Sequence, residues 1–190
     1  FVKDNGPGLE MSDLSRVFGE YLASSKFGRG RCSRGQQGIG ISAATTWAQL
    51  TTGQGVRVIS KTKNMKKAVR AVVEVDIKHN KGVSKNKETI DWDGSHGTPA
   101  VDTPVAGTPK VGAPVAVAPS ASAPFSNAST TGVAVEFFID GRIQLNGEGG
   151  LLNYINGTTL VNPHLRLRYK LPELEWQTVE RAVEIIPVIP

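Results

Sequence analysis

The chain has 190 residues, enough for one sizeable domain or for a domain with part of a second. It carries a formal net charge of +5, 39% of its residues are hydrophobic, and no apolar run is long enough to cross a bilayer. The single cysteine excludes an internal disulfide and favours a reducing compartment, so we expect a cytoplasmic protein. The chain shows no signal peptide. It starts at a phenylalanine, in residues typical of a strand end, so we expect it to be a fragment or to lack its natural start.

Positive charge is concentrated in the first half of the chain. Residues 1–98 hold 16 Lys and Arg against 9 Asp and Glu, whereas residues 99–190 hold 6 against 8. The excess comes mainly from Arg29, Arg31, Arg34 and the lysine-rich stretch 61–70. A basic surface of this kind attracts the phosphates of a nucleotide or of DNA. A solvated hairpin tip is the alternative interpretation of 61–70.

The first elements in chain order are a strand end, a turn and a helix. Residues 1–4 are typical of a buried strand end, and "NGPG" at 5–8 has the residues of a tight turn. Ser12 can cap a helix that runs to about Leu22. The apolar face of this helix consists of Leu14, Val17, Phe18 and Leu22.

A loop and a second helix follow. The segment 23–35 is polar, glycine-rich and basic, which is the composition of a mobile loop. A helix begins near Ile39 and ends before Gly53, which is a favourable C-cap. Trp47 in this helix and Trp92 further along the chain are expected to be core residues rather than platforms for stacked bases.

Alternating, valine-rich sequence then predicts a sheet. The segments 55–60 and 68–78 have the period of antiparallel strands, and 88–93 predicts a third, short strand. Proline recurs every five residues between positions 99 and 124, so we predict a disordered, Pro- and Ala-rich insert at 99–131. The remaining elements are a strand at 133–140, a helix at 149–160 and a strand at 164–170.

The stretch "RGQQGIGIS" at 34–42 indicates a function. Its glycines have the spacing G-x-x-G-x-G immediately before the second helix. A flexible backbone at a helix N-terminus often binds an anion, because free N–H groups and the positive end of the helix dipole point at it. The dinucleotide motif has the reverse spacing and the P-loop ends in G-K-[ST], so neither fits. Tight packing of helix on sheet is the alternative role for these glycines.

A second motif lies about thirty residues upstream, where "DNGPG" at 4–8 forms a D-x-G-x-G. A carboxylate at a strand end can accept a hydrogen bond from the exocyclic amine of adenine, and glycines beside it let the base approach the backbone. A plain turn is the alternative for this motif taken by itself. The two motifs, separated by a helix and a basic loop, together predict a nucleotide-binding site.

The pair of motifs resembles those of the Bergerat-fold (GHKL) ATPases. Within that superfamily the chain is similar to the B subunits of DNA topoisomerase VI, the type IIB topoisomerases, over nearly everything except the proline-rich insert. The segments that carry this narrower resemblance are "FGEYLASSKF" at 18–27, "SRGQQGIGISAA" at 33–44, "QLTTGQGVRVISKT" at 49–62, "DWDGSHGT" at 91–98, "VEFFIDGR" at 135–142 and "YINGTTLVNPH" at 154–164.

The order of strands and helices predicts an α+β fold with a mixed, largely antiparallel sheet and helices on one face. The resemblance implies that this fold is a Bergerat-type α/β sandwich with three regions. Residues 1–98 would be a partial ATPase domain with the adenine-site loop, the ATP lid and the glycine-motif helix. The insert would occupy 99–131. Residues 132–190 would be the end of the ATPase domain and the start of a linker or helical region.

The resemblance also implies roles for individual residues. Asp4 would recognise the adenine amino group, and Gly8 would leave room for the base. Ser25 and Lys26 would contact the ribose-phosphate part of ATP, and residues 35–42 would wrap the triphosphate through backbone N–H groups. The implied cofactor-binding residues are Asp4, Gly8, Ser25, Lys26, Gly35, Gln36, Gln37, Gly38, Ile39, Gly40, Ile41, Ser42 and Thr98.

Other parts of an ATPase site are implied to lie elsewhere. Thr98, in "HGT", would support the adenine-binding carboxylate. The catalytic glutamate and the asparagine that holds Mg²⁺ in the family belong upstream of Phe1, and a lysine for the γ-phosphate belongs to a later domain. The implied cofactors are ATP and Mg²⁺. We expect the chain to contain no catalytic residue and no metal ligand, and to hydrolyse ATP poorly or not at all by itself.

The implied function is that of the ATP-binding portion of a type IIB topoisomerase B subunit. ATP would dimerise two B subunits as a gate, while a topoisomerase VI A subunit cleaves both strands of DNA and a second duplex passes through the A2B2 enzyme. The implied partners are DNA, the A subunit and a second B subunit, with no membrane. The alternatives are another GHKL enzyme, such as a histidine kinase or a MutL-like ATPase, and a non-catalytic nucleotide- or DNA-binding module.

Overall fold

The structure is a computed structural model, and it describes residues 1–24, 26, 35–92, 131–172 and 174–184. The chain divides into two compact units, Phe1–Asp140 and Gly141–Pro190, and each is described by itself. The insert predicted at 99–131 lies outside the described residues, except for its last position.

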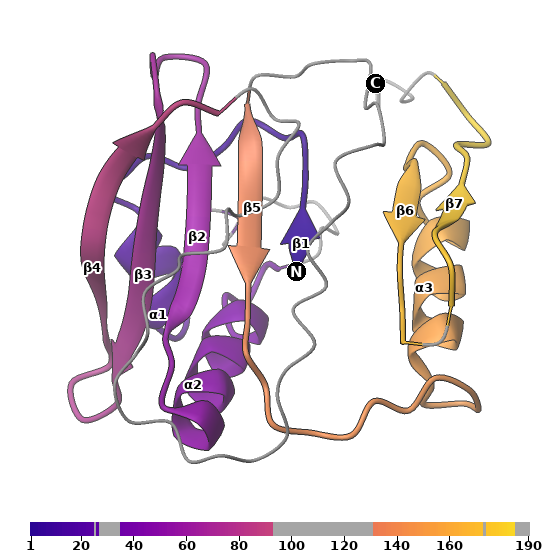
Figure 1. Cartoon of the computed structure of the whole chain (residues 1–190), viewed down its shortest axis with the longest axis horizontal. Coiled ribbons are helices and arrows are strands. Elements are labelled where there is room, and N and C mark those ends of the chain that lie inside the picture. The colour runs from indigo at the N-terminus through magenta and orange to yellow at the C-terminus, as the bar shows by residue number, and fades with distance from the viewer. Residues whose placement is uncertain (25, 27–34, 93–130, 173, 185–190) are drawn as a thin grey trace. The chain divides into compact units, whose positions relative to one another are not determined.

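The first unit is built on a five-stranded sheet with the order β1-β5-β2-β3-β4, in which each neighbouring pair is antiparallel (Figure 1). Strand β5 follows the insert in sequence, yet it pairs with both β1 and β2. The strands are β1 (Val2–Lys3), β2 (Val56–Lys61), β3 (Ala68–Asp76), β4 (Lys81–Ile90) and β5 (Gly132–Glu136).

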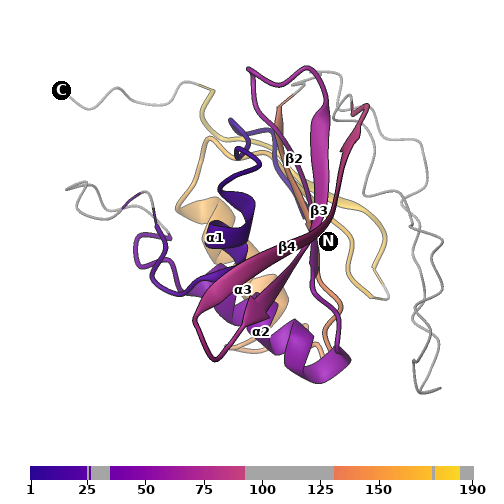
Figure 2. The ribbon, with the colours of Figure 1, turned by 90° about the vertical axis from the view of Figure 1, so that its left-hand side faces the viewer.

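Two helices of this unit, α1 (Leu14–Gly19) and α2 (Gly40–Thr52), cover one face of the sheet, which Figure 2 shows nearly edge-on. Helix α2 ends at the predicted place, because Gly53 takes φ 72° and donates its N–H to the carbonyl of Gln49. The predicted fold class, an α+β fold with a largely antiparallel sheet and helices on one face, is confirmed.

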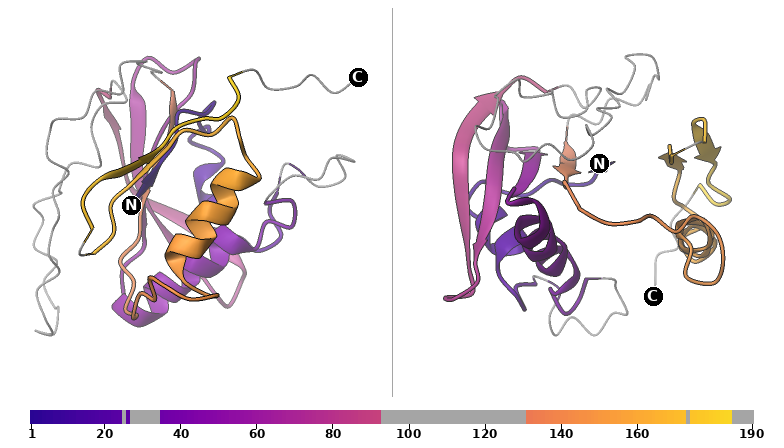
Figure 3. Two further views of the ribbon diagram at one scale, coloured as in Figure 1. Left: turned by 90° about the vertical axis from the view of Figure 1, so that its right-hand side faces the viewer. Right: turned by 60° about the horizontal axis from the view of Figure 1, so that its bottom comes forward.

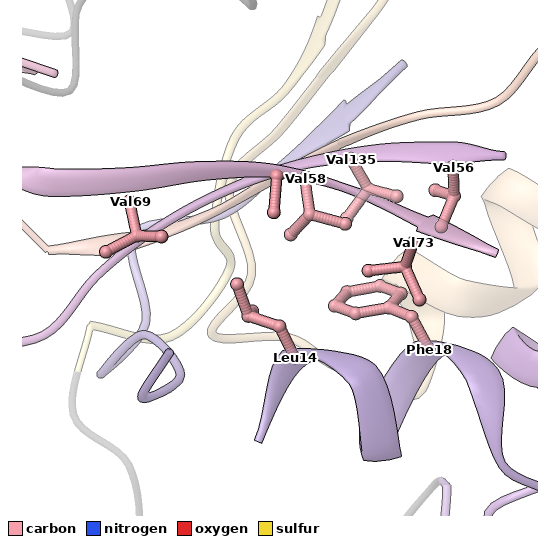
Figure 4. Close-up of a cluster of buried hydrophobic side chains, with 8 residues drawn as sticks. Leu14, Phe18, Val56, Val58, Val69, Val73 and Val135 are labelled. Carbon is pink, nitrogen blue, oxygen red and sulfur yellow. The ribbon is translucent and has the colours of Figure 1, made fainter. Parts of the chain in front are cut away.

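The main core lies between α1 and the sheet (Figure 4). Leu14 and Phe18 point from one face of α1 toward the sheet, where valines of β2, β3 and β5 meet them. These valines stand at alternate positions, as a strand with one buried face requires. The labelled residues of the cluster are Leu14, Phe18, Val56, Val58, Val69, Val73 and Val135.

The opposite face of the sheet holds a smaller core cluster under Trp92. This tryptophan is only 4% exposed and packs with Ile59, Ala68 and Ala134, so its prediction as a core residue is confirmed. Cross-strand ion pairs occupy much of the remaining face. They are Arg57 with Glu136, Arg70 with Glu88, and Lys85 with Glu74.

The prediction for the first helix is wrong at both ends. Asp13, rather than Ser12, is at the N-cap, and it makes no capping hydrogen bond through its side chain. The helix ends at Gly19 because the next backbone N–H groups take tertiary partners: Tyr21 donates to Asn80 Oδ1 and Leu22 to the Gly38 carbonyl. Leu22 therefore has φ 63° and is 63% exposed instead of belonging to the apolar face.

Two predictions of burial are also wrong. Val2 belongs to the edge strand β1 and is 69% exposed, so residues 1–4 are not a buried strand end. Trp47 is 55% exposed. The buried side of α2 instead presents small side chains, which let the helix lie close to the sheet. The buried residues of α2 are Ser42, Thr45, Thr46 and Ala48.

The predicted strand pairing agrees with the structure better than the predicted strand boundaries do. β2 and β3 are antiparallel as predicted, and residues 62–67 form the turn between them, so the stretch 61–70 is a hairpin. Strand β4 begins at Lys81, seven positions before the predicted segment at 88–93, and β5 ends at Glu136 rather than at 140.

The second unit consists of a helix followed by a two-stranded hairpin (Figure 3). Its elements are α3 (Leu151–Leu160), β6 (Leu167–Tyr169) and β7 (Gln177–Val179), of which β7 was not predicted. An ion pair of 3.0 Å between Arg166 Nε and Glu180 Oε2 joins the residues that flank the hairpin strands. Across the described part of the chain, helices are all too short or too polar to cross a membrane.

Candidate nucleotide-binding site

Asp4 sits where β1 ends, and one oxygen of its carboxylate is held by two backbone amides. Gly6 N–H donates to Asp4 Oδ1 over 2.8 Å, and Val133 N–H donates to the same oxygen over 3.2 Å. The side chain is exposed, and Oδ2 makes no hydrogen bond with the described residues. The second oxygen can therefore accept a hydrogen bond from a ligand.

Strand β5 fixes this carboxylate. The Asp4 N–H donates to the Val133 carbonyl over 2.9 Å, so that the Asp4 backbone and side chain both bond to the same residue. Gly132 has φ 145°, and a Cβ there would overlap the Asp4 carbonyl oxygen. Sequence reasoning missed Gly132 and Val133, because only the pairing of β5 with β1 brings them to Asp4.

Gly8 lies against β2 in this structure. It has φ 77°, and an added Cβ would overlap the carbonyl of Lys61. Nearby, Leu9 and Ser60 exchange two hydrogen bonds of 2.7 Å: Leu9 N–H donates to Ser60 Oγ, and that hydroxyl donates to the Leu9 carbonyl. Glycine is thus required at position 8 for the backbone to approach β2, whether or not a base lies beside it.

The glycine motif forms the approach to α2. Gly35 and Gly38 take φ 75° and 66°, which favour glycine, and a Cβ on Gly38 would come within 2.7 Å of the Ala23 carbonyl. Gly40 is different, because a Cβ there would meet no described atom within 4 Å. The described residues therefore leave space beside the first residue of the helix.

The N-terminus of α2 offers backbone N–H groups. The first hydrogen bond that closes a turn of this helix is donated by Ala43 N–H to the Ile39 carbonyl, over 2.9 Å. The N–H groups of Gly40, Ile41 and Ser42 have no backbone acceptor among the described residues. Together with the helix dipole they favour a negative charge at this end.

The side chains of the motif point in different directions. Gln36, Gln37 and Ile39 are exposed, whereas Ile41 packs against the main core. Ser42 is fully buried, and its hydroxyl donates to the carbonyls of Gly38 and Ile39. The Ser42 hydroxyl is therefore not available to a ligand.

The lysine of the predicted lid lies beside the motif. Lys26 Nζ is 3.9 Å from the position that a Cβ on Gly35 would take. Ser24 connects the two segments, since its hydroxyl donates to the Gly35 carbonyl over 2.8 Å and accepts from the Lys26 N–H over 3.1 Å. Ser25 and Thr98, which the resemblance also implies, lie outside the described residues.

Three residues that were not predicted anchor the start of this loop. The Tyr21 hydroxyl is 3.0 Å from Thr46 Oγ1 of α2, and the Tyr21 N–H donates to Asn80 Oδ1 in the β3–β4 turn. The Leu22 N–H donates to the Gly38 carbonyl over 3.0 Å. Tyr21 and Leu22 are adjacent but their partners lie far away in sequence, so no local pattern indicated this role.

The structure thus brings the predicted residues together in two groups. Asp4 lies where β1 ends and Gly8 lies against the last residue of β2, whereas Lys26 lies with the motif 35–42 at the start of α2. No hydrogen bond among the described residues joins the two groups. The described residues also contain no group of three or more His, Cys, Asp or Glu side chains that could hold a metal ion.

Comparisons with known proteins identify the relatives of this chain, although no family model matches it. The B subunit of type 2 DNA topoisomerase 6 from Natronomonas pharaonis is 30% identical over 186 residues, which are 98% of this chain and 18% of that protein. The B subunits of the same name from Archaeoglobus fulgidus and Methanothermobacter thermautotrophicus are each 30% identical, over 189 and 190 residues.

These alignments cover 100% and 99% of the chain but only 26% and 29% of the two relatives, so the chain spans less than a third of their length. The resemblance to topoisomerase VI B subunits, first seen in the short motifs, is confirmed over nearly the whole chain. Over nearly its whole length, the chain is thus homologous to a segment of the type 2 DNA topoisomerase 6 B subunits.

Proposed function

We propose that this chain is the ATP-binding portion of a type IIB DNA topoisomerase B subunit. The observation that carries the proposal is the state of the Asp4 carboxylate, in which two backbone amides hold one oxygen and leave the other exposed to a ligand. The relatives support the topoisomerase part of the proposal through their name. The nucleotide part depends on the geometry of the two motifs.

The adenine end of the site is the Asp4 turn. Asp4 Oδ2 would accept a hydrogen bond from the 6-amino group of the base, since a carboxylate accepts and an amine donates. Gly6 and Val133 keep the carboxylate in one orientation before the ligand arrives. A group that is fixed beforehand loses less side-chain entropy on binding, which favours affinity.

The phosphate end is the glycine motif at the start of α2. The N–H groups of Gly40, Ile41 and Ser42 would donate to phosphate oxygens, with Lys26 supplying a positive charge beside Gly35. The open space at Gly40 leaves room for the phosphates. Mg²⁺ would arrive bound to the triphosphate, which is the usual mode of binding for this ion.

Nucleotide binding would act on the assembly of the complete enzyme. ATP can favour a closed dimer of B subunits only through contacts that the open form lacks, because a ligand shifts an equilibrium by its differential affinity. The closed gate would then let a partner A subunit cleave one duplex while another duplex passes. In this proposal DNA, the A subunit and a second B subunit are the partners.

Calorimetry with an isosteric variant tests the adenine contact. Asp4→Asn retains an oxygen for Gly6 and Val133 but replaces the accepting Oδ2 by a donating amide. We expect this variant to bind a non-hydrolysable ATP analogue about tenfold more weakly or worse, because a donor faces the 6-amino donor at a cost of about 1–3 kcal/mol. The corresponding analogue without the 6-amino group is the matched control.

The two ligands make the result specific. The unaltered chain should prefer the analogue that carries the 6-amino group, and Asp4→Asn should remove most of that preference. Equal affinity of the unaltered chain and Asp4→Asn for both analogues would contradict the assignment of Asp4 as the adenine contact.

A further inference from the structure

A group of lysines at one end of the sheet is not used by the nucleotide site. It comprises Lys3 of β1, Lys61 at the end of β2, and Lys63, Lys66 and Lys67 around the β2–β3 turn. We call these five residues the basic end. In Figure 1 the β2–β3 turn lies at the opposite end of the strands from the β3–β4 turn.

Trp92 fixes two of these lysines in place. Lys3 Nζ lies 5.5 Å from the centre of the indole ring, a cation–π distance. Lys61 Nζ donates to the Trp92 carbonyl over 3.3 Å. Because Trp92 is itself buried in the smaller core cluster, it holds both ammonium groups near one another at the surface of the sheet.

The turn that carries the other lysines is anchored to the protein. Met65 N–H donates to the Thr62 carbonyl over 3.1 Å, and the Met65 side chain packs against the main core. Thr62 is buried, and its hydroxyl donates to Glu10 Oε1 over 3.0 Å. A turn held at these points presents its lysines with little loss of backbone entropy on binding.

The charges of the basic end are poorly neutralised. Elsewhere on this face the arginines and Lys85 form cross-strand ion pairs with glutamates. At the basic end Lys67 pairs with Asp91 over 3.0 Å. Lys63 and Lys66 are exposed and form no ion pair or hydrogen bond with another described residue. The basic end of the sheet therefore carries a local excess of positive charge.

We propose that the basic end binds the phosphate backbone of duplex DNA. Lysine ammonium groups neutralise phosphates and release counterions, which gives affinity without sequence specificity. The relatives are named DNA topoisomerase subunits, and this choice of polyanion rests on the DNA-handling part of the proposed function. The inference does not depend on the nucleotide contacts of Asp4 or of the glycine motif.

The test compares two double charge reversals in the chain of 190 residues. Lys63→Glu with Lys66→Glu changes the basic end, and Lys78→Glu with Lys81→Glu makes the same change of net charge at the β3–β4 turn. Binding of a fluorescent duplex is measured by anisotropy at several salt concentrations. For the basic-end variant we expect weaker binding and a salt dependence that is shallower by about 2 in log–log slope, one for each lost phosphate contact.

The control variant should retain the affinity and the slope of the unaltered chain. Equal loss in both variants would show that net charge alone matters and would overturn the proposal. An unchanged basic-end variant, or no salt-dependent duplex binding by the unaltered chain, would overturn it as well. Calorimetry with the ATP analogue separates this result from the nucleotide site, because both double variants should bind the analogue as the unaltered chain does.

Discussion

At the residue scale, local hydrogen bonds decide what each carboxylate can do. Asp4 has one oxygen held by backbone amides and one exposed oxygen, which can accept a hydrogen bond from a ligand. Asp76 is engaged through both oxygens: Oδ2 lies 2.7 Å from His79 Nδ1, and the N–H groups of Lys78 and His79 donate to Oδ1. Asp4 directly follows β1 and Asp76 is the last residue of β3, but only Asp4 has an oxygen that can accept a hydrogen bond from a ligand.

The His79 contact makes Asp76 a more acidic group. The hydrogen bond from the His79 side chain, more than any other cause, lowers the pKa of Asp76 below its ordinary value. We predict that His79→Ala raises the pKa of Asp76 toward that value, as a carboxyl NMR titration would show. Lys78→Ala is the control, because it keeps the backbone N–H that donates to Asp76 and should leave the pKa low.

The sign of the effect on stability follows from the lowered pKa. The folded state binds the Asp76 proton less tightly than the unfolded state, so the contribution to stability is present above the unfolded-state pKa. It is lost as the pH falls through the lowered folded-state pKa. A titration in which His79→Ala leaves the pKa of Asp76 unchanged would contradict this assignment.

At the element scale, the packing of α1 on β4 depends on two glycines. The Cα atoms of Gly19 and Gly82 face each other, and a Cβ on Gly82 would overlap the carbonyl oxygen of Ser15. This obstacle is backbone rather than a flexible side chain, so α1 would have to move. We predict that Gly82→Ala lowers the free energy of unfolding by about 1–3 kcal/mol, measured by chemical denaturation.

Gly40→Ala is the matched control for that measurement. A Cβ on Gly40 meets no described atom within 4 Å, and the φ of Gly40 is not in the left-handed region, so alanine should leave stability unchanged or raise it slightly. If Gly82→Ala unfolds at the same denaturant concentration as Gly40→Ala, the close contact of α1 with β4 is not required for stability.

The sequence predicts an element well where the conformational preference of its residues agrees with the burial of their side chains. Helix α2 ends at Gly53 because a left-handed residue closes the helix, and β2 and β3 alternate because one face packs on α1. Trp92 is buried because it covers the small residues of the outer face. The signals for α2, β2 and β3 are each contained in a few neighbouring residues, whereas the burial of Trp92 was expected from its residue type alone.

The elements that the sequence predicts poorly depend on distant partners. Most of β4 is exposed and polar, and the positions where it meets α1 are small, so no hydrophobic alternation marks its start at Lys81. The end of α1 depends on the bonds of Tyr21 and Leu22 to Asn80 and Gly38. Trp47 is exposed because small, hydroxyl-bearing residues form the buried side of α2.

The same distinction holds for the candidate site. The glycine spacing and the position of Asp4 were visible in sequence, since each is a short local motif. The support of Asp4 by Gly132 and Val133 was not visible, because β5 reaches β1 only after the insert. The requirement for glycine at position 8 was visible, but the contact that causes it, with the backbone of Lys61, was not.

At the scale of the whole molecule, the two faces of the first unit's sheet differ in composition and in what they contact. The inner face packs on α1 and α2, and the proposed nucleotide contacts lie at the end of β1 and the start of α2. The outer face is charged and mostly neutralised by ion pairs, with the basic end as the exception. The basic end adjoins the proposed adenine contact, since Lys3 directly precedes Asp4 and the Lys61 carbonyl lies against Gly8.

The central claim is that Asp4 and the start of α2 hold opposite ends of one nucleotide, and a crystal structure of the chain with a non-hydrolysable ATP analogue tests it most directly. We predict that Asp4 Oδ2 accepts a hydrogen bond from the 6-amino group while the N–H groups of Gly40, Ile41 and Ser42 donate to phosphate oxygens. An ordered analogue bound elsewhere, or one whose base lies away from Asp4, would contradict the account.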